Sequence, residues 1–143
     1  MVDCEFCSSS GGDILWQDER CRVIRVGGSE AADFPGFCRV IWKEHKREMN
    51  DLSVADRQHL MAVVFATESA LRELYQPFKI NLASLGNVTP HVHWHVIPRF
   101  ADDPLFPSPI WSKQARKPGE PPARPAIDNQ TLSKAIQQAL TQA

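Results

Sequence analysis

Short stretches rich in apolar residues recur along the chain and are typical of β-strands, and the last of them, around the histidines, alternates strictly between polar and apolar residues. The stretches lie at residues 13–16, 20–26, 37–42, 78–82 and 91–99. Gln17-Asp18-Glu19 separates the first two stretches, which predicts a hairpin, and Phe34-Pro35-Gly36 predicts a turn before the third. Because the connections are short, the pattern favours an antiparallel sheet.

A helical period lies between Ser53 and Pro77. Apolar residues recur there at helical spacing, and Ser53 with Asp56 is a variant of the capping box. Pro77 predicts the end of this helix. A second, shorter helix is predicted near the end of the chain, where Asp128 or Asn129 would cap it and the apolar positions are Leu132, Ile136 and Leu140.

Proline-rich sequence separates the last predicted strand from the short helix. Seven of the eleven prolines fall between residues 104 and 125, which argues against regular helix or sheet there and predicts an extended tail. We expect one domain over residues 1–111, followed by a proline-rich tail and a short C-terminal helix over 112–143. The expected fold class is α+β: an antiparallel sheet of about five strands, one main helix packed across it and a C-terminal helix.

Composition narrows the classes of partner. The formal net charge of −1 provides no general attraction to nucleic acid or to acidic membranes, so neither is expected as a specific partner. No apolar run is long enough to span a membrane, and the N-terminal sequence lacks the basic and apolar regions of a signal peptide. Four cysteines without a secretion signal are typical of reduced thiols or metal ligands, and we expect a cytoplasmic location.

The most informative polar positions are three histidines in the last predicted strand. His91, His93 and His95 stand at i, i+2 and i+4 within His-Val-His-Trp-His-Val-Ile, so a strand would point them to one side. Evenly spaced imidazoles at a surface can act as nucleophile, acid, base or metal ligand near neutral pH. At about 3.3 Å per residue, the first and last Cα atoms are about 13 Å apart, which suits an extended substrate such as a phosphate chain better than one metal ion.

The motif His-Val-His-Trp-His-Val-Ile-Pro-Arg resembles the histidine triad (HIT) family, whose pattern is three histidines separated by apolar residues. The preceding Leu85-Gly86-Asn87-Val88-Thr89-Pro90 is similar to a bacterial branch described as diadenosine polyphosphate hydrolases. The resemblance covers about residues 4–111, most of the chain. It implies an α+β meander fold, a homodimer and a small-molecule nucleotide substrate.

The resemblance also implies a role for each histidine. His93 matches the family's nucleophile, which attacks the α-phosphorus and forms a covalent nucleotidyl-histidine intermediate that water then hydrolyses. His95 matches a donor to a phosphate oxygen, and His91 orients the row or binds zinc. No cofactor is required for this catalysis.

Further phosphate donors are expected near the row, from Asn81 and from the loop that precedes the histidines. The candidates are Asn81, Asn87, Thr89 and Gly86. Their alternative role is turn chemistry, since Gly-Asn is a common turn pair. Two departures from the family pattern stand out: Val88 replaces a small hydroxyl residue, and Glu30 or Asp33 would have to replace an aspartate that holds the ribose.

A structural zinc site is a separate hypothesis. Cys4 and Cys7 form Cys-x-x-Cys, which is a weak signal alone. Some bacterial members of the family combine such cysteines with a histidine after the third strand, here His45, and with the first histidine of the triad, here His91. These four side chains would make a closed tetrahedral site. The alternative is an N-terminus with two free thiols and a solvated His45.

Three functions remain open at this stage. The first is a hydrolase of dinucleoside polyphosphates such as diadenosine tetraphosphate. The second is a hydrolase of nucleoside phosphoramidates or aminoacyl-adenylates with the same mechanism. The third is a nucleotide-binding interaction protein with little catalysis. Trp111 also has two possible roles: stacking on a base at the pocket or pinning the proline-rich tail.

Overall fold

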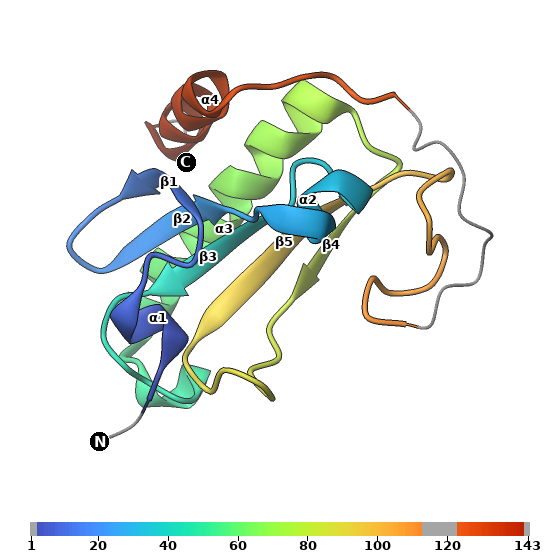
Figure 1. Ribbon diagram of the computed structural model, residues 1–143. Helices are drawn as coiled ribbons and strands as arrows, with labels where there is room; N and C mark the ends of the chain where they lie inside the picture. Colours follow the sequence, from blue (N-terminus) through green and yellow to red (C-terminus); the bar gives the residue numbers. More distant parts are fainter. Residues whose placement is uncertain (1–2, 113–122, 142–143) are drawn as a thin grey trace.

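The computed structural model describes residues 3–112 and 123–141. Its centre is a five-stranded antiparallel sheet in the order β1-β2-β3-β5-β4 (Figure 1). The strands are β1 (Asp13–Gln17), β2 (Cys21–Arg25), β3 (Cys38–Trp42), β4 (Lys79–Ala83) and β5 (His93–Arg99). Together with the helices, this confirms the predicted fold class.

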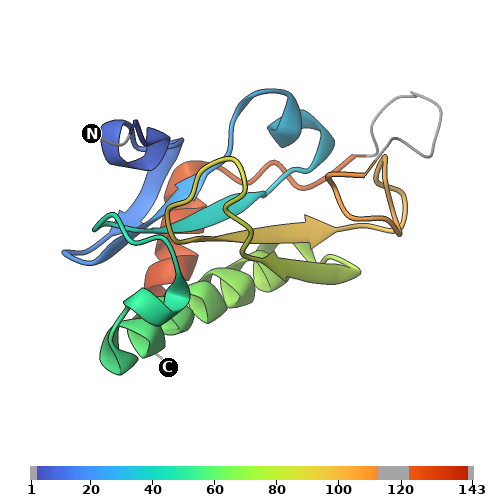
Figure 2. The same ribbon diagram turned by 90° about the horizontal axis from the view of Figure 1, so that it is seen from below.

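Helices lie on both faces of the sheet. The long helix α3 (Val54–Tyr75) crosses one face with α4 (Asn129–Thr141) beside it, and the short helices α1 (Glu5–Ser8) and α2 (Gly28–Asp33) lie on the other (Figure 2). A 3₁₀ turn at Met49–Asp51 precedes α3. The sequence pattern does not predict α1 and α2, because helices of four and six residues are too short to show a period. No helix among the described residues has the length and apolar character needed to cross a membrane.

The ends of α3 follow from its sequence as predicted. The Ser53 hydroxyl accepts a hydrogen bond from the Asp56 backbone N–H at 3.1 Å and so caps the first turn. The helix stops at Gln76, which has a left-handed backbone with φ 49°, directly before Pro77.

Each face of the sheet has its own apolar core. On the α3 face, Val23, Val40 and Val96 pack with residues of α3 and α4. On the opposite face, Ile24, Ile41 and Ile97 pack with other apolar residues, namely Cys4, Phe6, Val26, Phe34, Phe37, Leu105 and Ile110. Because the strands are apolar on both faces, the histidine face is partly covered rather than open.

Two boundaries differ from the sequence prediction. β5 begins at His93 rather than at residue 91. The carbonyl of Val92 still accepts from the N–H of Trp42, the last residue of β3, but its N–H donates to the Lys46 carbonyl beyond that strand. The extended tail predicted from residue 104 is wrong for residues 104–112, which form a series of hydrogen-bonded turns. Residues 113–122 of that tail lie outside the described part of the chain.

Candidate functional site: the histidine row and its pocket

Backbone carbonyls determine which nitrogen carries the proton in two of the three rings. His91 Nε2 lies 2.5 Å from the Trp42 carbonyl oxygen, and His93 Nδ1 lies 2.6 Å from the His91 carbonyl oxygen. A carbonyl only accepts, so each of these nitrogens is the N–H of its ring. The unprotonated nitrogen of the neutral ring is therefore Nδ1 in His91 and Nε2 in His93.

The three rings are buried rather than at the surface. Only 1% of His91 and 5% each of His93 and His95 are exposed, because α1 and the segment after β5 cover the row. The Phe6 ring of α1 lies 4.8 Å from the His93 ring, and the Trp111 ring lies 4.9 Å from the His95 ring, both edge-on. The sequence pattern predicts the common direction of His93 and His95, but not this cover.

Burial keeps the row neutral. It lowers the pKa of His93, although the hydrogen bond to the His91 carbonyl opposes the shift. Burial also lowers the pKa of His95 to about 3, helped by the neighbouring His93 ring and by the positive charge of Arg39. Near neutral pH both rings therefore have an unprotonated nitrogen, which is what a nucleophile or a base needs.

A cavity of about 480 Å³ opens beside His93 and His95. Its other walls come from α1, α2, β3, the 85–89 loop and Trp111, and the lining residues are Glu5, Phe6, Glu30, Arg39, Leu85, Gly86, Asn87, Val88, Thr89 and Trp111. A volume of this size is typical of sites for small organic ligands.

The structure brings most of the sequence-predicted residues to this cavity. Gly86, Asn87 and Thr89 line it together with the two histidines. Glu30, one of the two candidates for the ribose, also lines it, and Asp33 does not. The Trp111 ring contacts the His95 ring directly, which favours a role at the pocket over a role in pinning the proline-rich tail.

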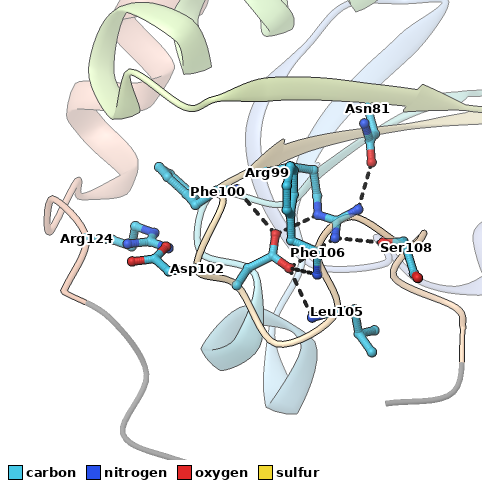
Figure 3. A network of polar contacts seen from close by, with 9 residues as sticks. Asn81, Arg99, Phe100, Asp102, Leu105, Phe106, Ser108 and Arg124 are labelled. Carbon is cyan, nitrogen blue, oxygen red and sulfur yellow. Dashed lines mark hydrogen bonds and ion pairs between the residues drawn. The ribbon is translucent and has the colours of Figure 1, made fainter. Parts of the chain in front are cut away.

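Asn81 lies elsewhere. Its side-chain oxygen accepts a hydrogen bond from Arg99 at 2.9 Å, and it lines a neighbouring hollow along β4 instead of the histidine pocket. Arg99 itself is only 2% exposed and is held by Asp103 (Figure 3). The structure thus joins the half-buried Asn81 to the buried Arg99 in one hydrogen-bond network outside the pocket lining.

Arg39 is a pocket residue that sequence reasoning missed. It is the second residue of β3, and its Nε–H donates to His95 Nδ1 at 3.2 Å. A charged residue between apolar neighbours in a buried strand is a signal in the sequence, but assigning it to His95 requires knowing that β3 pairs with β5.

A second cluster lies at the start of the row. Ligand atoms of Cys4, Cys7, His45 and His91 all lie within 4.8 Å of one another. His91 Nδ1 is 3.4 Å from Cys4 Sγ, 3.5 Å from Cys7 Sγ and 3.2 Å from His45 Nδ1, and Cys7 Sγ is 3.4 Å from His45 Nδ1. Residues that are far apart in the sequence thus converge on one point.

These spacings fit a tetrahedral metal site. Bonds of about 2.0–2.1 Å to nitrogen and about 2.3 Å to sulfur place the ligand atoms of a zinc tetrahedron roughly 3.3–3.8 Å apart. The His91 hydrogen bond to the Trp42 carbonyl leaves Nδ1 as the coordinating nitrogen, and such an outer contact orients metal-binding histidines. The donor set of two thiols and two imidazoles is one that zinc prefers.

The chain belongs to the HIT domain family, whose model matches residues 10–102. Members of this family are generally nucleotide hydrolases or transferases, and some are non-catalytic. A search of curated proteins finds no match to the chain.

Solved structures support the fold. A histidine triad protein from Marinobacter aquaeolei is 26% identical, with coverage of 96% of this chain and 94% of that one and a TM-score of 0.69. A HIT protein from Sinorhizobium meliloti is 22% identical, with coverage of 97% and 96% and a TM-score of 0.69. A zinc-bound HIT family protein from Mycobacterium smegmatis is 22% identical, with coverage of 98% and 94% and a TM-score of 0.58.

Proposed function

We propose that this protein hydrolyses nucleotide derivatives at the α-phosphorus, with dinucleoside polyphosphates such as diadenosine tetraphosphate as the main substrates. One observation carries the proposal: His93 donates through Nδ1 to the His91 carbonyl, so its Nε2 is unprotonated in a ring that lines the pocket. A neutral imidazole held in this form is ready to act as a nucleophile.

The reaction would proceed in two displacements. The Nε2 lone pair attacks the α-phosphorus, a P–N bond forms, and the P–O bond to the leaving phosphate chain breaks with its electron pair. Water then attacks the same phosphorus, which releases the nucleoside monophosphate, returns the electron pair to Nε2 and leaves a proton for solvent. Each step is easier than a direct displacement by water. Donors to the phosphoryl oxygens would come from His95 and from the 86–89 loop.

A second substrate class is favoured by the charges at the pocket. Among the described residues that line it, Glu5 and Glu30 are acidic and Arg39 is basic. Two carboxylates oppose a long polyanionic leaving group but accept an amine. We therefore keep adenosine phosphoramidates and aminoacyl-adenylates as the alternative substrates, with the same nucleophile.

The test is a comparison of catalytic efficiencies. Purified protein is assayed with diadenosine tetraphosphate and with an adenosine phosphoramidate, and kcat/KM is measured for each. We expect turnover of both, with release of adenosine monophosphate, and the higher value identifies the preferred leaving group. Binding of adenosine monophosphate without turnover of either compound would instead assign a nucleotide-binding role.

We also propose that Cys4, Cys7, His45 and His91 hold a structural zinc ion. The spacing of the four ligand atoms supports this, and a zinc-bound relative in the family makes it plausible. A closed site of four protein ligands has no open position for substrate, so its role would be to stabilise the fold. It would tie α1 and the segment after β3 to the start of the histidine row.

Protein purified without chelator is expected to contain about one equivalent of zinc per chain. Cys7→Ser should lose the metal and lower the melting temperature, because metal binding contributes to folding free energy. Cys38→Ala is the matched control, since Cys38 is buried in the α3-side core and lies outside the cluster. Metal analysis of the three proteins decides: less than about a tenth of an equivalent in the wild type would remove the proposal.

The homodimer implied by the family resemblance stays a prediction. β4 is an edge strand of the sheet, and an edge strand offers unpaired backbone groups to a second chain. A mass by light scattering of about twice that of one chain would support it, and a monomer mass would contradict it.

A further inference from the structure

Arg39 and His95 face each other across two paired strands. The register of β3 and β5 places Arg39 directly opposite His95, so the two side chains share one face of the sheet. Arg39 Nε lies 3.2 Å from His95 Nδ1. Its guanidinium group lies 5.1 Å from the centre of the Phe37 ring, and Nη2 lies 4.0 Å from a Glu30 carboxylate oxygen. These contacts hold the arginine in place.

Only one placement of the His95 proton is compatible with this contact. An arginine Nε–H donates and never accepts, so His95 Nδ1 must accept and is unprotonated. A neutral His95 then carries its proton on Nε2. Burial beside a guanidinium disfavours the doubly protonated ring, in agreement with the lowered pKa of His95.

His95 therefore differs from its neighbour. His93 is protonated on Nδ1 by contact with a backbone carbonyl, whereas the partner of His95 is a side chain from another strand. The two rings, 4.9 Å apart, have complementary forms: one presents an unprotonated Nε2 and the other an Nε2–H. A nucleophile beside a hydrogen-bond donor is what attack on a phosphoryl group needs.

We propose that Arg39 is a positioning residue that holds His95 in the Nε2–H tautomer, so that His95 donates to a phosphoryl oxygen of the substrate. The donation to phosphate rests on the proposed function, but the tautomer does not, because it follows from the contact between the two side chains. The role of Arg39 is thus to decide whether His95 is a donor or an acceptor.

A matched pair of substitutions separates the two tautomers. Arg39→Gln places an amide nitrogen at the same number of bonds from Cα as the arginine Nε, so it can still donate to His95 Nδ1. Arg39→Glu has nearly the same shape but places an acceptor there, which requires His95 to be protonated on Nδ1. The direct measurement is the pair of ¹⁵N chemical shifts of the His95 ring, assigned by their loss in His95→Asn.

We expect the Nε2–H tautomer in the wild type and in Arg39→Gln, and the Nδ1–H tautomer in Arg39→Glu. In turnover assays, Arg39→Glu should lower kcat by about 10²–10³-fold, as the loss of one donor to a developing oxyanion does, with a smaller loss in Arg39→Gln. A general structural defect would affect both variants alike and would not switch the tautomer.

Two results would overturn the proposal. One is a wild-type His95 that is protonated on Nδ1. The other is an Arg39→Glu variant that folds and keeps the wild-type tautomer. If Arg39→Glu fails to fold, the wild-type spectrum still decides, since a donor-only guanidinium beside Nδ1 requires the Nε2–H tautomer. If the tautomers are as expected but no nucleotide derivative is turned over by the wild type, the proposed function fails and the role of Arg39 in setting the tautomer stands.

Discussion

Replacing His93 with alanine is expected to reduce turnover of nucleotide derivatives by roughly 10⁴- to 10⁶-fold, the range seen when a covalent nucleophile is removed. The reason is that no other imidazole in the row presents an unprotonated nitrogen to the pocket. His93 presents an unprotonated Nε2, whereas the contact with Arg39 leaves the proton of His95 on Nε2. The Nδ1 of His91 points into the cysteine and histidine cluster.

The measurement is kcat/KM for diadenosine tetraphosphate, with circular dichroism to verify the fold. His59→Gln is the matched control. His59 lies on α3, its Nε2 is within hydrogen-bond distance of Asp18 Oδ2 at 2.6 Å, and it does not line the pocket. It should keep full turnover. A His93→Gly variant should still bind a nucleoside monophosphate, because the pocket remains. Turnover retained in His93→Ala would contradict the covalent mechanism.

Replacing Asp103 with alanine is expected to lower the free energy of unfolding by about 3–5 kcal/mol, the usual cost of leaving one member of a buried ion pair alone. Arg99 is 2% exposed and Asp103 is equally buried, and two hydrogen bonds of 2.7 and 3.0 Å join them (Figure 3). The Asp103 carboxylate also accepts hydrogen bonds from the backbone N–H groups of Phe100, Leu105 and Phe106. Its loss would leave the buried guanidinium group without a counter-charge, although Asn81 and the Ser108 carbonyl still accept from it, and would leave these backbone donors without their acceptor.

The adjacent residue provides the control. Asp102 pairs with Arg124, whose side chain is 11% exposed, but the Asp102 side chain itself is 59% exposed. Because water screens an exposed carboxylate, Asp102→Ala should change the free energy of unfolding by less than about 1 kcal/mol. Urea denaturation of both variants at pH 7 gives the comparison. Equal effects at the two positions would contradict the role of the buried pair.

The same network predicts a pH dependence. Burial alone would raise the pKa of Asp103, but the hydrogen bonds and charge of Arg99 and the backbone N–H groups outweigh it and lower the pKa. A carboxyl whose pKa is lower in the folded state stabilises the fold above its unfolded pKa of about 3.9, and this stabilisation is lost as pH falls through the folded pKa. The wild type should therefore lose stability in acid more steeply than Asp103→Asn.

Local patterns predicted the elements near their observed bounds. Short apolar runs bounded by turn residues placed the five strands, and Ser53 and Pro77 placed α3, because capping and proline geometry act within a few residues. The common direction of the histidines was also predictable, since side chains two residues apart on a strand share a face. The pattern did not extend to α1 and α2, because helices of four and six residues are too short to show a period.

The sequence by itself determined which residue types could do chemistry: three spaced histidines, a Cys-x-x-Cys pair and the loop before the row. Only the tertiary structure decided their protonation and their partners. Arg39 reaches His95 because β3 lies beside β5, and Asn81 turns to the buried Arg99 instead of the pocket. Hydrogen bonds across strands join residues remote in the chain, and the tautomer of an imidazole depends on the group it meets there rather than on its sequence neighbours.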